Sequence, residues 1–131
     1  MTNIFSPEWM AKFQDAWNSE PELSGELAKI GFDSVIGYGF DDDAEPIGVL
    51  TVKNGEVVES GAYCGQALNW DLRSSSDNWQ KWLSNPPGMM ALGMAYTTGK
   101  LKFNSGDYSA MLKDPRMAGP FIKSFAVMGK V

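Results

Sequence analysis

Apolar residues recur at helical spacing over the first part of the chain. Ser6 and Pro7 supply an N-cap hydroxyl and the residue type favoured at the first helical position. The apolar positions that follow form one stripe, consisting of Trp9, Met10, Phe13, Ala16 and Trp17. This spacing predicts a helix that ends near Asn18. A second, shorter helix is predicted from Leu23 to Ile30, just before Gly31.

The pattern then changes to an alternation of period two, which indicates β-strands. Four strands joined by short hairpins are predicted, over residues 34–40, 47–53, 56–63 and 68–73. Between the second and third strands, Asn54-Gly55 is a strong hairpin signal, because a type I′ turn needs positive φ at both central residues. In the fourth strand, alternation leaves Asp71 and Arg73 as an exposed pair and directs inward Leu68, Trp70 and Leu72.

The second half of the chain predicts helices around one more strand. Serines 74–76 cap a helix that ends before Pro86 and carries Trp79, Trp82 and Leu83. The apolar residues 89–97 predict a further helix, and residues 100–104 predict a fifth strand. Asp107 and Asp114 each begin a helix, and the last helix places on one face Met117, Phe121, Phe125 and Met128. Gly119-Pro120 is expected to loosen its first turn.

This order of elements predicts an α+β fold. Strands grouped together, with helices towards both ends, favour one five-stranded, mainly antiparallel sheet covered by helices on one face. The 131 residues suffice for a single domain, 1–131, with a substantial core.

Charge and composition exclude several classes of function. The net charge of −5 disfavours a nucleic-acid binder and gives no general attraction to anionic membranes. The absence of histidine removes the usual catalytic triads and imidazole metal sites. The single cysteine, Cys64, fits a reducing compartment and is expected to be buried and inert. With no bilayer-length apolar run, no secretory signal and no peroxisomal address, we expect a cytoplasmic protein without stable membrane insertion.

The C-terminal half resembles a known family of lipid-binding domains. The segments that carry the resemblance are the apolar run Gly88–Tyr96, the glycine-led strand Lys100-Leu101-Lys102-Phe103, Gly106-Asp107 and the closing helix. They are similar to the sterol carrier protein 2 (SCP2) family, in the form of a bacterial-type single-domain member. The resemblance implies a sheet covered by helices around an apolar tunnel. It also implies an apolar small molecule as partner: a fatty acid, an acyl-CoA or a sterol-like lipid.

The residues expected to line this tunnel come from four helices or strands of the second half. They are Trp79, Trp82, Leu83, Met89, Met90, Leu92, Met94, Leu101, Phe103, Phe121, Phe125 and Met128. Methionines suit a cavity because their unbranched side chains adapt to varied apolar shapes. The same stripes are equally typical of ordinary core packing. The tunnel is expected between the inner face of the sheet and the helices that contain residues 89–94 and 121–128.

Other functions remain as alternatives to a lipid carrier. The acidic run Asp41–Glu45 lacks the glycine and distal glutamate of a calcium loop, so we interpret it as a solvated hairpin loop without metal. No residues have the spacing of a catalytic site, and neither an enzyme nor a cofactor is expected. The runner-up is a non-catalytic interaction module whose apolar groove holds a partner helix or a second copy of the chain as a homodimer.

Overall fold

The computed structural model describes residues 4–131, with the exception of the Leu112 side chain. The helices are α1 (Pro7–Asn18), the π-helical turn η1 (Pro21–Gly25), α2 (Glu26–Lys29), α3 (Ser76–Ser84), α4 (Met89–Thr97), α5 (Tyr108–Leu112) and α6 (Pro115–Met128). The strands are β1 (Ser34–Phe40), β2 (Gly48–Lys53), β3 (Glu56–Ala62), β4 (Trp70–Ser74) and β5 (Lys102–Ser105). The predicted elements are therefore confirmed, with shifts of one or two residues at several ends.

The five strands form one mixed sheet in the order β3-β2-β1-β4-β5. β1, β2 and β3 are antiparallel neighbours, and β5 is antiparallel to β4. The predicted hairpin between the third and fourth strands is wrong, because β4 lies beside β1 and parallel to it. The α+β class and the mainly antiparallel sheet are confirmed.

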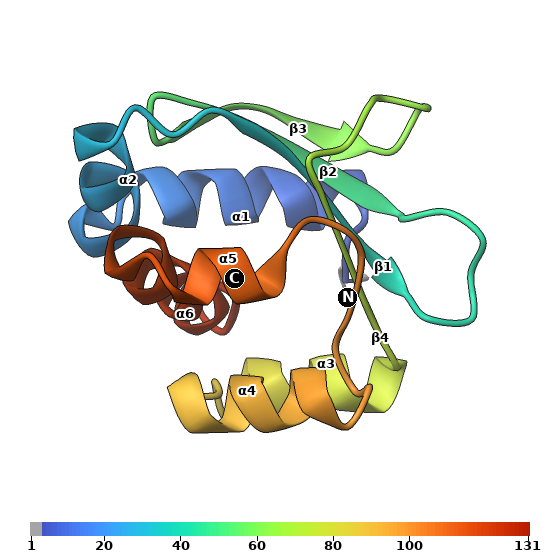
Figure 1. The fold of residues 1–131 in the computed structure, drawn as a ribbon. Helices are drawn as coiled ribbons and strands as arrows, with labels where there is room; N and C mark the ends of the chain where they lie inside the picture. Colours follow the sequence, from blue (N-terminus) through green and yellow to red (C-terminus); the bar gives the residue numbers. More distant parts are fainter. Residues whose placement is uncertain (1–3) are drawn as a thin grey trace.

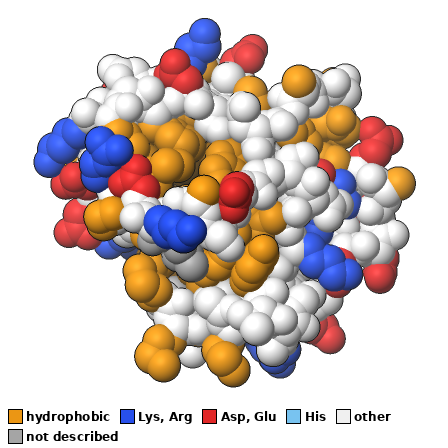
Figure 2. Space-filling model, viewed as in Figure 1, with side chains coloured by type: hydrophobic (Ala, Val, Ile, Leu, Met, Phe, Trp, Pro, Cys, Tyr) orange, Lys and Arg blue, Asp and Glu red, His pale blue; other side chains and the backbone are white. Residues whose placement is uncertain are grey.

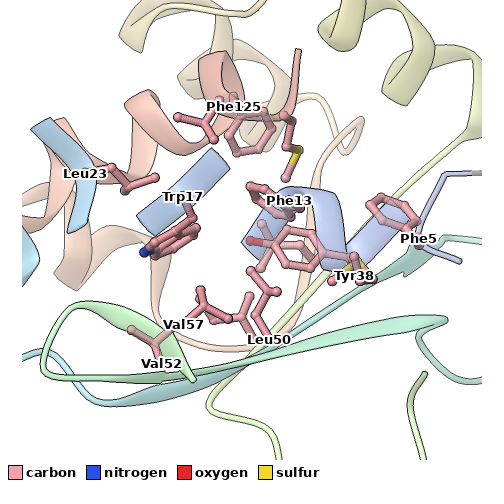
Figure 3. Packing of buried hydrophobic residues seen from close by; sticks show 14 of the residues in the cluster. Phe5, Phe13, Trp17, Leu23, Tyr38, Leu50, Val52, Val57 and Phe125 are labelled. Atoms are coloured by element: carbon pink, nitrogen blue, oxygen red, sulfur yellow. The ribbon is translucent and has the colours of Figure 1, made fainter. Parts of the chain in front are cut away.

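The helices cover one face of this sheet, and α3 and α4 lie at one end of the molecule (Figure 1). Between sheet and helices lies an aromatic core in which Phe5 contacts the rings of Trp9, Tyr38 and Trp79. Phe125 of α6 stacks on Trp79 with ring centroids 6.1 Å apart. Figure 3 shows this core between α1, α6 and the sheet.

The β2–β3 hairpin is fastened to α1 through polar side chains. Asn54 and Gly55 have φ of 51° and 85°, as the predicted turn requires. The Trp17 indole N–H donates to the Gly55 carbonyl at 3.0 Å. Asn18 donates to the carbonyl of Val57 at 2.9 Å and accepts from its N–H at 2.8 Å, so the side-chain amide pairs with the edge strand as a further strand would.

The outer face of the sheet is covered by chain as well, which corrects the expected exposure of Asp71 and Arg73. Both side chains are buried, and Arg73 Nε donates to the carboxylate of Asp71 at 2.6 Å. The guanidinium also donates to the backbone carbonyl of Asp43 at 2.7 Å. The acidic loop after β1 folds over the arginine. The alternation in β4 therefore predicted correctly that both side chains lie on the outer face of the sheet, but not that this face is covered.

Replacing Asp71 with alanine is expected to lower the free energy of unfolding by about 3–5 kcal/mol, because the Arg73 guanidinium stays buried without its carboxylate. Urea unfolding followed by tryptophan fluorescence measures the loss. Asp42→Ala, in the exposed part of the acidic loop, is the control and should change stability by less than about 0.5 kcal/mol. Replacing both Asp71 and Arg73 with leucine should cost less than Asp71→Ala alone. An equal or larger loss in the double variant would contradict a buried, mutually dependent pair.

Candidate ligand site

A small apolar cavity lies between the inner face of the sheet and the helices of the two chain halves. Its volume is about 40 Å³. β1 and β4 supply its floor, and the segment from α1 to α2 and the helices α5 and α6 supply its walls. The lining residues are Trp17, Leu23, Leu27, Phe32, Ile36, Tyr38, Trp70, Leu72, Met111, Met117, Pro120, Phe121 and Ser124.

Two hydroxyl groups, those of Tyr38 and Ser124, belong to the lining residues. Ser124 donates its hydroxyl proton to the carbonyl of Phe121 on its own helix. Tyr38 is 2% exposed, and burial raises the pKa of its phenol above the usual value. The phenol is therefore neutral at ordinary pH, and its proton can be donated. Of the residues that the structure describes, no lysine or arginine lines the cavity.

A surface groove adjoins the cavity at one side. Phe32, Trp70, Met111 and Met117 line both, so these four side chains lie between the cavity and the groove, and we call them the mouth. The remaining described groove residues include three carboxylates, those of Asp33, Asp107 and Asp114, and no lysine or arginine. Asp33 and Asp107 accept hydrogen bonds from backbone N–H groups, and Asp114 pairs with Arg116 beside the groove at 3.0 Å. Arg116 lowers the pKa of Asp114 through its side-chain hydrogen bond. The mouth is thus apolar in the centre and acidic at the rim.

The first half of α6 forms a lid over the cavity. The Asp114 carboxylate caps the helix by accepting from the N–H of Arg116. The helix then continues through Pro120 to Met128. The expected weak point, Gly119-Pro120, lies inside the wall, since Pro120 faces the cavity. Proline has no N–H to donate, so this turn of the lid lacks one helical hydrogen bond.

Ion pairs join the second half of α6 and the residues after it to the segment that faces them. Lys123 of α6 lies 3.6 Å from the Glu20 carboxylate and 3.2 Å from that of Glu22, and Lys130 lies 3.6 Å from Glu20. The pKa of Glu20 is lowered, chiefly by the N–H of Glu22 and then by the two lysines. These charged groups lie at the surface, so they hold α6 only weakly.

The structure brings few of the sequence-predicted site residues to this cavity. Phe121 lines it, and Phe103 and Phe125 contact Phe121 with ring centroids 5.9 and 5.3 Å apart. Phe125 itself is buried in the core, as are four others, all at 2% exposed or less: Trp79, Leu92, Leu101 and Met128. Trp82 and Leu83 are half-buried and pack against this core.

The α4 methionines lie on the surface instead of in a cavity. Met89, Met90 and Met94 are 53%, 86% and 65% exposed. The expected position of the tunnel, between residues 89–94 and the sheet, is therefore corrected. α4 is apolar on nearly every side, so its sequence did not show which side would be buried. Leu92 and Ala95 take that side.

Most of the cavity lining was not predicted from the sequence. Ile36 and Tyr38 lie in the predicted strand 34–40, and Met117 lies in the predicted stripe that contains Phe121, but none of the three was predicted as a site residue. Leu23, Leu27 and Phe32 flank a short helix with no motif. They reach the cavity because η1 and α2 pack against α6, a contact between the two ends of the chain that local periodicity does not show.

Several other features of the described residues bear on function. Cys64 is exposed, which corrects its expected burial. Among residues 4–131, no cluster of three or more His, Cys, Asp or Glu side chains could hold a metal ion. No helix in the same range has the length and apolarity needed to cross a membrane.

Comparison with solved structures identifies the fold. A crystal structure of sterol carrier protein 2 matches with a TM-score of 0.73 and 17% identity, covering 98% of this chain and 99% of the other. A conserved hypothetical protein from Thermus thermophilus, described as possibly a sterol carrier protein, matches with a TM-score of 0.65 and 16% identity, over 98% and 91% of the two chains. A structure described as a UbiJ-SCP2 ubiquinone synthesis protein matches with a TM-score of 0.57 and 9% identity, over 93% and 88%.

The chain has the SCP2 fold. The resemblance inferred from Gly88–Tyr96 and the following strand is thereby confirmed at the level of structure. No family model and no curated protein matches the sequence. At these identities the likeness establishes the fold and leaves the ligand to be argued from the cavity.

Replacing Glu20 with glutamine is expected to speed entry of an apolar dye, because the C-terminal end of α6, on which the lid depends for its position, loses the carboxylate shared by Lys123 and Lys130. A roughly two- to fivefold faster fluorescence rise with Nile red at neutral pH is expected, as for loss of surface ion pairs. Glu26→Gln is the control, since Glu26 pairs with Lys29 within its own helix.

The same ion pairs predict a dependence of the entry rate on pH. Because folding lowers the pKa of Glu20, its contribution is complete above the usual glutamate pKa and is lost as the pH falls through the lowered value. Dye entry into the unmodified protein should therefore accelerate in acid, and the acceleration should be smaller in the Glu20→Gln variant. Equal rates and equal pH profiles in the unmodified protein and both variants would contradict this role for the ion pairs.

Proposed function

We propose that the protein binds a fatty-acyl or sterol-like lipid between the sheet and α6 and acts as an intracellular lipid carrier. The observation that carries the proposal is the apolar cavity between the sheet and α6, which shares the side chains of Phe32, Trp70, Met111 and Met117 with a groove at the surface. The SCP2 fold supports it, because one of the solved structures that share the fold is a sterol carrier protein.

The ligand must widen the cavity in order to bind. A cavity of about 40 Å³ is much smaller than ligand pockets, which measure roughly 300–1,000 Å³. We expect the lid, the first half of α6, to be the wall that moves, because Pro120 removes one helical hydrogen bond from it. Movement of Phe121 would extend the cavity towards its ring neighbours Phe103 and Phe125. These three residues are the part of the predicted site that we retain as ligand contacts.

Burial of the ligand provides the binding energy, with no chemical step. Each methylene removed from water contributes about 0.8 kcal/mol. A chain of about a dozen methylenes therefore offsets the cost of ordering the ligand and displacing the lid. We propose neither catalysis nor a cofactor.

A second candidate function, that of an interaction module, is favoured by the exposed methionines of α4. In that case the partner would contact Met90 and Met94 and leave the cavity closed. A larger side chain inside the cavity should weaken lipid binding but leave an interaction through α4 unchanged, so it distinguishes the two functions.

Replacing Ile36 with phenylalanine is expected to abolish or strongly weaken lipid binding, because the added ring occupies much of the cavity. Native mass spectrometry after incubation with cholesterol and with hexadecanoic acid measures the bound fraction. Val58→Phe is the matched control, since Val58 is 50% exposed on β3. Overpacking costs roughly 1–3 kcal/mol of stability, so urea unfolding must show that the variant is folded. Absence of any lipid complex with the unmodified protein, or equal binding by the folded Ile36→Phe variant, would overturn the proposed function.

A further inference from the structure

The hydroxyl of Tyr38 is positioned by the core but has no hydrogen-bond partner among the described residues. Tyr38 lies in the middle of β1, and its ring contacts Phe5 and Phe13 with centroids 5.7 Å away in each case. Trp79 holds it from a third side. Figure 3 shows the hydroxyl directed away from Phe5 and towards Trp17, whose side chain also lines the cavity.

The neighbouring polar groups are occupied by other partners. The indole N–H groups of Trp17 and Trp79 donate to the carbonyls of Gly55 and Gly39. Ser124 donates to Phe121. Among residues 4–131, no group makes a hydrogen bond to the Tyr38 hydroxyl, and Tyr38 borders the open space of the cavity. A hydroxyl that borders a cavity and makes no hydrogen bond to the described protein indicates where a ligand atom or water belongs.

We propose that Tyr38 donates a hydrogen bond to an oxygen at the buried end of a neutral lipid. This inference rests on the proposed function and narrows its ligand. A phenol that keeps its proton matches a carbonyl, ester or hydroxyl oxygen.

The charges around the cavity disfavour an anionic ligand end, both inside the cavity and at its mouth. Inside, a carboxylate would lose its hydration without meeting a lysine or arginine of the described chain, which is very unfavourable. At the mouth it would meet Asp33 and Asp107, which have no ion-pair partner in the described part of the chain. Arg116 is paired with Asp114, and the exposed Lys113 next to it does not line the groove. A long-chain alcohol, a ketone, an ester or a sterol therefore fits better than a free fatty acid or an acyl-CoA.

Displacement of Nile red by three sixteen-carbon probes tests this assignment. The probes are 1-hexadecanol, hexadecanoic acid above its pKa, and hexadecane. Hexadecanol is expected to bind at least tenfold more tightly than the acid. Tyr38→Phe should weaken hexadecanol binding by roughly three- to tenfold, as for loss of one hydrogen bond, and leave hexadecane unchanged.

Tyr108→Phe is the matched control. The Tyr108 hydroxyl likewise has no hydrogen-bond partner among the described residues, but it is fully buried and Tyr108 does not line the cavity. Its removal should therefore change none of the three affinities. Equal binding of alcohol and acid, or an effect of Tyr108→Phe in place of Tyr38→Phe, would overturn the assignment and leave the lipid-binding function standing. Failure of all three probes to bind would overturn both.

A second inference rests on α4 and is independent of the cavity. Met90 and Met94 are among the most exposed large apolar side chains of the described residues. Figure 2 shows hydrophobic side chains protruding at the lower edge of the molecule, where Figure 1 places α4. Large exposed apolar side chains that lie together mark interaction surfaces.

The charges around α4 indicate the kind of partner. Residues 78–106 contain Lys81, Lys100 and Lys102 and no aspartate or glutamate, although the whole chain carries a net charge of −5. All three lysines are exposed. Lys81 faces Ala91 of α4 across a shallow groove, and Lys100 follows the end of the helix. The geometry points to an anionic bilayer surface, on which methionines enter the interface and lysines contact headgroups. The net negative charge of the chain is thus compatible with local membrane attraction.

Sedimentation with phospholipid vesicles tests this surface. The protein is expected to bind phosphatidylcholine vesicles that contain phosphatidylserine, and to bind pure phosphatidylcholine at least tenfold more weakly. Replacing Met90 and Met94 with serine, or Lys100 and Lys102 with glutamate, should each reduce binding at least tenfold. Val58→Ser, at an exposed apolar site on β3, should have no effect. Failure to bind anionic vesicles, or a dimer that the methionine variant dissociates, would overturn the assignment in favour of a protein partner.

Discussion

The crossing of the chain over the outer face of β1 is the constraint on which the site depends. The segment between β3 and β4 passes Gly37, where an added Cβ would lie 3.0 Å from the Leu68 side chain. On the same face, a Cβ at Gly39 would lie 2.8 Å from the backbone of Pro46. A side chain at Gly39 would collide with backbone, so the loop after β1 would have to shift. The segment that crosses at Gly37 leads into β4, which pairs in parallel with β1, so Trp70 and Leu72 lie beside Ile36 and Tyr38. That pairing forms the floor of the cavity.

Much of the fold was predictable because its signals are local. The capped start of α1, the Asn54-Gly55 turn and the limits of α4 follow from residue types within a few positions of each other. The position of β4 in the sheet was not predictable, because the alternation of residues within a strand does not show which strand lies beside it. The burial of Arg73 was missed for the same reason: the carbonyl that binds it belongs to Asp43, thirty residues earlier.

The candidate site was only partly predictable, because its walls come from both ends of the chain. The apolar stripe of α6 was found, and Phe121 lies where a lid residue should. The opposite wall consists of Leu23, Leu27 and Phe32, whose role depends on the packing of η1 and α2 against α6. The methionines of α4, in contrast, were predicted to line the cavity but lie on the surface. Their composition suggested a cavity, but a uniformly apolar helix of nine residues can bury only the side that meets the core.

The small cavity and the lid that covers it are related physically. Close packing behind the lid would make its displacement expensive, since every lost contact must be replaced. Here the lid covers a space that protein atoms do not fill, and Pro120 already removes one helical hydrogen bond from the wall. Opening therefore forfeits fewer contacts than it would over a filled core, and a ligand chain that enters supplies the missing ones. The hydroxyl of Tyr38 acts in the same direction, because it has no partner among the described residues and an occupant of the cavity can accept its hydrogen bond.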